Sequence, residues 1–160
     1  MQWDKDSYDT HCQWMQYALQ LAAKAGEVGE IPVGAVLVDA SGQIMGEGNN
    51  RKERDRDPTA HAEIMAMRAA AKKLSDWHFN PLTLYVTLEP CPMCSGAIIQ
   101  ARIGTLVYGV DDPKTGAIRS VLNLPDSAAS NHHLDVIGGV LYQDCRQQLK
   151  TWFQQKRDRK

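Results

Sequence analysis

The chain has 160 residues, 43% of them hydrophobic, and a formal net charge of −1. This length supports one compact domain over residues 1–160 with a substantial core and is too short for two. The near-neutral charge excludes a uniformly basic nucleic-acid binder, so any polyanion must meet a local patch. No apolar stretch is long enough to span a membrane, and residues 1–6 are polar and acidic, unlike a signal or transit peptide. We therefore expect a cytoplasmic protein with no membrane partner.

Hydrophobic periodicity and turn residues divide the chain into alternating helices and strands. In chain order we expect a helix at 7–25, strands at 33–38 and 43–47 joined by a turn at 39–42, a polar loop at 48–57, a helix at 57–74, a connector at 77–81, a strand at 82–88, a helix at 91–101, strands at 105–110 and 134–137, and a helix at 144–157. This alternation predicts an α/β fold, a three-layer α/β/α sandwich around a central mixed five-stranded sheet.

Two helix starts carry the residues of chemical interest. Asp57-Pro58 predicts the start of the central helix, with the Asp as N-cap and the Pro at the first helical position. His61 and Glu63 then lie in the first turns of that helix. Cys91 and Cys94 lie in the first turn of the next helix, where the i, i+3 spacing puts both sulfurs on one face. Because a helix N-terminus favours thiolate over thiol, we expect both cysteines to be inclined to ionise.

One imidazole and two thiolates form a ligand set that Zn²⁺ accepts. The motifs are His61-Ala62-Glu63 and Pro90-Cys91-Pro92-Met93-Cys94, a pattern typical of zinc-dependent nucleobase deaminases. Three protein ligands (His61, Cys91 and Cys94) leave one tetrahedral position for water, and Glu63 remains free to move protons. The motifs therefore predict one zinc ion and hydrolytic loss of ammonia from a base.

Two other interpretations of the cysteines stay open. A structural zinc site would fill its fourth position with another Cys or His. The candidates, none at ligand-like spacing, are Cys12, Cys145, His11, His78, His132 and His133. A redox C-x-x-C pair would require thioredoxin-like surroundings, which the sequence lacks. Cys12 and Cys145 lie in helix-like segments, and we expect them to be ordinary core residues.

Four segments, at 31–38, 57–66, 84–94 and 114–117, together resemble the bacterial tRNA-specific adenosine deaminase family, which is cytidine deaminase-like. The likeness runs in order from about residue 17 to residue 153. It implies a homodimer with one Zn²⁺ per subunit that converts adenosine at the wobble position (A34) of tRNA(Arg) to inosine. The implied metal ligands and proton carrier fall on the same four residues as those argued above.

The resemblance also implies contacts with the substrate. Asn50 matches a family asparagine that hydrogen-bonds the flipped base, and Val33 and Pro90 would help to wall the pocket. Taken from the residues alone, Asn50 fits a turn after Gly48, because Asn tolerates left-handed geometry. Both interpretations of Asn50 stay open.

Contact with the anticodon loop of the tRNA requires a local patch. Residues 150–160 combine basic side chains with Trp152 and Phe153, which suits phosphates and unpaired bases. The same composition describes a terminal amphipathic helix that packs both rings on the core. The family uses an aromatic residue at the position of Phe153 against the anticodon loop. Arg51 is a further candidate for RNA contact, within a mixed-charge loop that we otherwise expect to be solvated.

Two segments depart from the family pattern, at 118–124 and at 154–155, where basic residues are common. Residues 131–133 resemble a family Asn-His pair, with no role beyond a turn. Guanine deaminases share the motifs at 57–63 and 90–94, whereas the residues at 31–33, 85–87 and 114–117 favour the tRNA enzymes. A non-enzymatic alternative is an RNA- or partner-binding module stabilised by a structural zinc ion.

Overall fold

The computed structural model describes residues 4–160; the first three residues, on which the expectation about a signal peptide partly rests, lie outside the described part. The elements in chain order are α1 (Lys5–Glu27), β1 (Gly34–Val38), β2 (Ile44–Asn49), α2 (Lys52–Asp55), α3 (Ala62–Leu74), β3 (Thr83–Leu88), α4 (Pro92–Gln100), β4 (Thr105–Val110), β5 (Asp135–Gly138) and α5 (Tyr142–Asp158). The strands form one sheet in the order β2-β1-β3-β4-β5. β1 is antiparallel to both neighbours, and β3, β4 and β5 run parallel, so the predicted mixed sheet is confirmed.

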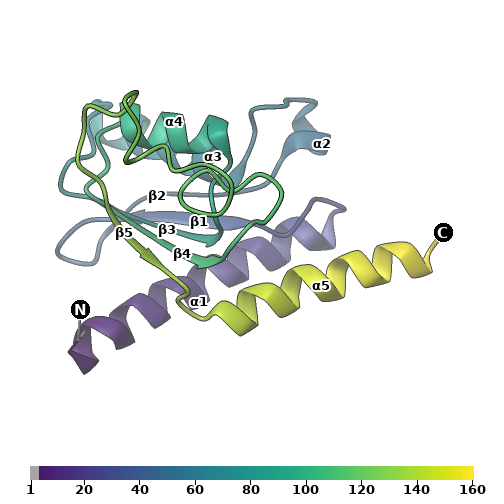
Figure 1. Ribbon diagram of the computed structural model, residues 1–160. Helices are drawn as coiled ribbons and strands as arrows, with labels where there is room; N and C mark the ends of the chain where they lie inside the picture. Colours follow the sequence, from purple (N-terminus) through teal and green to yellow (C-terminus); the bar gives the residue numbers. More distant parts are fainter. Residues whose placement is uncertain (1–3) are drawn as a thin grey trace.

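Helices cover both faces of this sheet. α1 and α5 lie on one face, and α3 and α4 lie on the other (Figure 1). The pleat of β3 sends neighbouring side chains to opposite layers: Leu84 joins the buried cluster under α3 and α4, and Tyr85 joins the one under α1 and α5. The three-layer sandwich follows from these two separate cores. Within residues 4–160, no helix has the length and apolarity needed to cross a bilayer.

The two cysteines outside the C-x-x-C motif pack in the core layer under α1 and α5. Cys145 is fully buried, and Cys12 is half-buried against the same cluster. All four cysteines of the chain, each within the described residues, are free thiols. Cys12 and Cys145 therefore have the packing role expected of them.

The start of α3 differs from the prediction. The helix begins at Ala62, with His61 as its N-cap, rather than at Asp57-Pro58. The Asp57 carboxylate accepts hydrogen bonds from the backbone N–H and hydroxyl of Thr59, and so closes a turn instead of capping a helix. The preceding polar loop also contains one helical turn, α2, which the sequence did not indicate.

The long connection between β4 and β5 is fastened to the end of α4. Arg102 donates two hydrogen bonds to Asn131, and the Nε2 of His132 lies 2.6 Å from the carbonyl oxygen of Ile103. His132 is therefore the donor tautomer at Nε2, since the carbonyl can only accept. These contacts give residues 131–133 an anchoring role.

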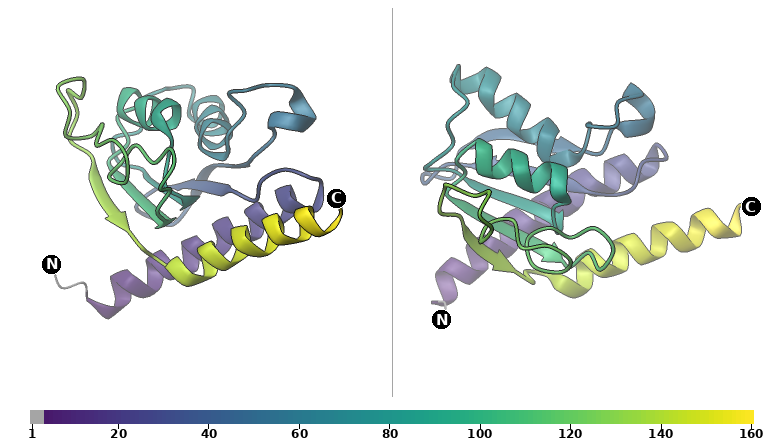
Figure 2. Two further views of the ribbon diagram at one scale, coloured as in Figure 1. Left: turned by 45° about the vertical axis from the view of Figure 1, so that its right-hand side comes forward. Right: turned by 45° about the horizontal axis from the view of Figure 1, so that its top comes forward.

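α5 projects beyond the edge of the sheet, so that its C-terminal half contacts little besides α1 (Figure 2). The side chains of Gln148 and Trp152 donate hydrogen bonds to the carbonyl oxygens of Leu19 and Gly26. The two helices therefore run side by side in the same direction.

Gly34 lies where β1 crosses α1. A Cβ atom there would overlap the carbonyl oxygen of Ala18 and lie 2.7 Å from the backbone nitrogen of Ala22. We expect Gly34→Ala to lower the free energy of unfolding by roughly 1–3 kcal/mol, because backbone must move to relieve the overlap. Urea denaturation measures this. Gly96→Ala is the control: nothing lies within 4 Å of its added Cβ, and we expect stability equal to or above the parent.

Candidate active site

The predicted metal ligands meet where α3 and α4 begin, at the carboxyl end of β3. The Nδ1 atom of His61 lies 3.6 Å from the sulfur of Cys91 and 3.5 Å from that of Cys94. The three ligand atoms all lie within 4.8 Å of one another. His61 thus forms one group with two cysteines that follow it by 30 and 33 positions in the sequence.

This group fits a zinc ion with an open position. Its donors are one imidazole and two sulfurs, the set that zinc accepts. Within residues 4–160, no fourth His, Cys, Asp or Glu joins them. None of the six candidates for a fourth ligand belongs to the group. A structural zinc site would need four Cys or His ligands, so the group does not fit that interpretation.

The two thiols ionise differently. Hydrogen bonds from Cys94 and His61 lower the pKa of Cys91 to about 4. The same contact with Cys91, together with burial and the nearby Glu63, raises the pKa of Cys94. The expectation that both thiols are inclined to ionise is therefore correct for Cys91 alone, because two neighbouring sulfurs cannot both carry charge without a cation to neutralise them.

Glu63 lies in the first turn of α3 and is 4% exposed. Burial raises the pKa of its carboxyl group, despite the opposing effects of Cys94 and His61. A raised pKa makes the carboxylate of Glu63 a stronger proton acceptor than an ordinary glutamate. Its position beside the ligand group suits the role of proton carrier.

A cavity of about 120 Å³ opens over this group. Five predicted residues line it: Val33, Asn50, His61, Glu63 and Cys91. The sequence reasoning missed the other six lining residues as site residues: Ile31, Lys52, Leu88, Glu89, Asp112 and Thr115. The cavity is far smaller than the roughly 300–1,000 Å³ pockets that hold drug-sized ligands, so it has room for one small group such as a base.

Pro90 and Arg51 lie next to the cavity but do not line it. Pro90 is buried, and its carbonyl oxygen accepts hydrogen bonds from the Ser95 hydroxyl and the Ala117 N–H. The guanidinium of Arg51 makes two hydrogen bonds to Asp55, and its side chain borders a separate groove beside α1 and α3. The cation at the cavity is instead its neighbour, Lys52.

Asn50 connects the loop before β1 to the start of α3. It is 8% exposed; its Nδ2 donates to the carbonyl oxygen of Ile31, and its Oδ1 accepts the backbone N–H of Ala62, both at 3.0 Å. His61 makes no side-chain cap bond, so Asn50 serves α3 as a cap from a distant position in the sequence. One N–H of the amide remains for a substrate atom.

Glu89 is the buried carboxylate between β3 and the metal ligands, and it is 2% exposed. It accepts the backbone N–H groups of Asp112, Ile118, Arg119 and Ser120, together with the Ser120 hydroxyl. Burial alone would raise the pKa of Glu89, but these hydrogen bonds outweigh it and the net pKa is lowered. Its only signal in the sequence is its place in the segment at 84–94, directly before Pro90.

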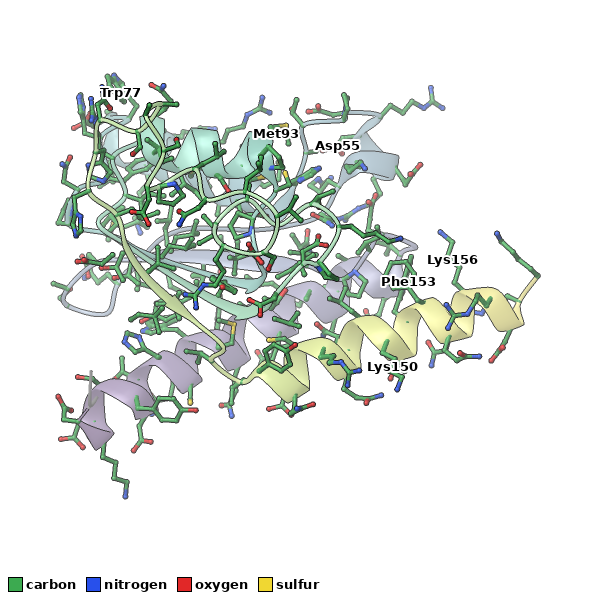
Figure 3. All side chains as sticks on the ribbon, in the orientation of Figure 1. Asp55, Trp77, Met93, Lys150, Phe153 and Lys156 are labelled. Carbon is green, nitrogen blue, oxygen red and sulfur yellow. The ribbon has the colours of Figure 1, made fainter. Side chains whose placement is uncertain are left out.

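The two aromatic residues of the C-terminal tail have different surroundings. Trp152 is half-buried and donates to the carbonyl oxygen of Gly26, whereas Phe153 is 40% exposed. Phe153 and Lys156 project from one side of α5, and Lys150 projects from the other (Figure 3). The ammonium of Lys156 lies 4.9 Å from the ring centroid of Trp152. Trp152 therefore packs on the core, as the interpretation as a terminal amphipathic helix expects. The ring of Phe153 stays exposed, as the interpretation as an RNA contact expects.

Comparisons with known proteins agree on one chemistry. The MafB19-like deaminase family matches residues 9–156. The tRNA-specific adenosine deaminase of Haemophilus influenzae is 53% identical over 91% of this chain and 84% of its own length. A solved tRNA:A34 deaminase is 40% identical, with a TM-score of 0.82 over 85% of this chain and 98% of its own. The guanine deaminase of Nitrosomonas europaea is 26% identical, with a TM-score of 0.74 over 86% of this chain and 81% of its own.

Replacing Asn50 should loosen the start of α3. We expect Asn50→Ala to lower the free energy of unfolding by roughly 1–3 kcal/mol, because the buried Ala62 N–H loses its partner and the Ile31 carbonyl loses one of its two. Urea denaturation at neutral pH measures the change, with the exposed Asn80→Ala as control. Equal midpoints for Asn50→Ala and the parent would contradict the capping role.

The lowered pKa of Glu89 makes part of the stability depend on pH. The unfolded carboxyl, with a pKa near its ordinary 4.5, binds a proton more readily than the folded one. Its contribution is therefore fully present above about pH 4.5 and is lost as the pH falls through the lowered folded value. We expect Glu89→Gln to lose stability less steeply than the parent below that pH. Parallel slopes in urea titrations from pH 6 to pH 3 would contradict this.

Proposed function

This chain belongs to the tRNA-specific adenosine deaminases, and on that premise we propose that it hydrolyses the wobble adenosine, A34, of tRNA(Arg) to inosine. The observation that carries the proposal is the open group of His61, Cys91 and Cys94 with Glu63 buried beside it. The 53% identity to an enzyme named for this substrate supports the choice of tRNA adenosine. The chain would work as one deaminase domain, as a homodimer in the cytoplasm.

The cofactor of the proposed reaction is one Zn²⁺ per subunit. His61, Cys91 and Cys94 would hold it, and Glu63, which lies outside the ligand group, would not. Bound there, the ion would supply Lewis acidity and so make a water molecule a better nucleophile near neutral pH. The low pKa of Cys91 means that one ligand is ionised before metal arrives, and the second proton leaves as metal binds.

Glu63 would carry the protons. Its carboxylate takes a proton from the attacking water and passes it to the ring nitrogen beside the reacting carbon. Glu63 then takes the proton of the new hydroxyl group on that carbon and gives it to the exocyclic amine, which leaves as ammonia as its bond to the carbon breaks and the carbonyl forms. Burial raises the pKa of Glu63 and so makes its carboxylate a stronger base toward the water.

The surroundings of the cavity suit a base taken out of its stack. Val33 and Asn50 line it, and the remaining N–H of the Asn50 amide can donate to the base. Phe153 offers an exposed ring for stacking on a neighbouring loop base, with Lys156 on the same side of α5 for phosphate. Pro90 acts behind the wall, and Arg51 remains a candidate contact only if its pair with Asp55 opens.

Guanine deamination is the nearest alternative, because guanine deaminases share this fold. Two solved guanine deaminases are 26% and 37% identical to this chain, below the 53% of the tRNA-specific relative. An RNA-binding module with a closed structural zinc ion fits less well, since the group within residues 4–160 has only three ligands. Release of ammonia from guanine, without activity on RNA, would favour the first alternative.

The first test is inosine formation in a tRNA(Arg) anticodon stem-loop. We expect the zinc-loaded parent to produce inosine at A34, detected by mass spectrometry, and Glu63→Ala to lose at least about 100-fold in kcat with zinc still bound. Metal analysis of the same preparations separates the two roles. Loss of zinc from Glu63→Ala, or retained activity, would contradict the assignment of Glu63. No inosine from the parent would contradict the substrate.

The exposed ring of Phe153 should matter for RNA and not for folding. We expect Phe153→Ala to weaken binding of the stem-loop by roughly 1–3 kcal/mol, the range for one lost base stack. Fluorescence anisotropy measures binding. Tyr142→Ala, which removes another exposed ring from α5 near its first turn, is the matched control. Equal affinities for parent and Phe153→Ala would remove the stacking role.

A further inference from the structure

The segment 112–120 closes over the cavity as a strap and is held by one side chain. The carboxylate of Glu89 accepts four backbone N–H groups from the strap, at 2.9 to 3.1 Å, and one hydroxyl. Hydrogen bonds to a buried carboxylate are stronger than those between neutral groups. Five of them on one side chain make Glu89 the main attachment of the strap.

The strap approaches Glu89 as closely as a backbone can. A Cβ atom on Gly116 would lie 2.5 Å from the carboxyl carbon and from both oxygens of Glu89. A second attachment lies beside the first, where the Ala117 N–H donates to the Pro90 carbonyl oxygen at 2.9 Å. This close approach gives a physical reason for glycine in the Lys-Thr-Gly-Ala motif at 114–117.

The strap carries one wall of the cavity. Asp112 and Thr115 line it on the strap, across from Val33 and Asn50. The Asp112 carboxylate accepts the N–H groups of Lys114 and Thr115 and the Thr115 hydroxyl, so the turn is internally rigid. A rigid turn moves as a unit when its main attachment, the Glu89 carboxylate, is released.

We infer that Glu89 is a positioning residue that holds the strap in the closed geometry and so sets how tightly the substrate base is enclosed. The inference rests on the proposed function for the identity of the base. The oxygens of Glu89 are occupied by strap groups, and Glu89 is outside the group of His61, Cys91 and Cys94. Glu89 therefore acts on substrate binding, and the chemical step stays with Glu63.

Glu89→Gln tests this directly. The amide keeps the shape of the side chain, but its Nε2 end cannot accept the hydrogen bonds that one carboxylate oxygen accepts, and the negative charge that strengthens the others is lost, so the strap is released. If the closed strap falls to about one tenth of the population, the apparent KM rises about tenfold with kcat nearly unchanged. Steady-state kinetics on the A34 stem-loop measure both constants. A fall in kcat with unchanged KM, or unchanged kinetics, would overturn the inference.

Hydrogen exchange provides a readout that does not depend on the substrate. In Glu89→Gln we expect faster exchange of the amides of Asp112, Ile118, Arg119 and Ser120, with exchange in the sheet unchanged. Zinc content should equal that of the parent. Asp111→Asn is the matched control: it removes a charge next to the strap, from a side chain that accepts only the Tyr108 hydroxyl. Parent-like exchange of the four amides in Glu89→Gln would overturn the inference.

Gly116→Ala reaches the same contact from the other side and leaves Glu89 intact. Its Cβ would push the strap away from the carboxylate, so we expect the same rise in KM and the same loss of amide protection. Opposite results in the two variants would contradict a shared cause. If the parent makes no inosine, the proposed function fails, whereas the exchange experiment still decides the role of Glu89.

Discussion

The site depends on two helix N-termini that meet with their N-cap side chains turned toward each other. His61 and Cys91 are the N-caps of α3 and α4, and neither makes a side-chain cap bond. An N-cap normally satisfies the free N–H groups of the first turn, so these two positions give up that stabilisation for chemistry. The chain compensates in two ways: Pro92 has no N–H to satisfy at the first position of α4, and Asn50 accepts the Ala62 N–H at the start of α3.

The remaining walls of the cavity are positioned by side chains that make hydrogen bonds to the backbone. Glu89 holds the strap, Asn50 holds the start of α3, and the buried Glu30 accepts the Arg54 N–H at 2.8 Å and so fixes the loop that bears Lys52. Each contact joins segments far apart in the sequence. The cavity is thus preformed by polar side chains that bond to distant backbone groups, which favours a single geometry over an ensemble.

Periodicity was sufficient to predict the elements and the mixed sheet, because helices and strands bury one face at fixed spacing. The motifs were sufficient to predict the metal-ligand group, because few residue types can bind zinc. The predicted start of α3 was wrong, because Asp57-Pro58 suits a turn as well as a helix start. The hydrogen bond that marks the true start, from the Ala62 N–H to Asn50, comes from a residue outside the helix. The position of Glu89 before Pro90 did not indicate its role, because that role exists only once the strap folds back over it.

The attachment of the strap to Glu89 has a consequence for how this enzyme can vary. Four of its five bonds go to backbone N–H groups, which every residue except proline provides. The exposed side chains of Arg119 and residues 121–123 can therefore be exchanged without removing these four bonds, in a stretch where we expect departures from the family pattern. Substitutions there can thus vary this surface segment while the reaction centre keeps its geometry.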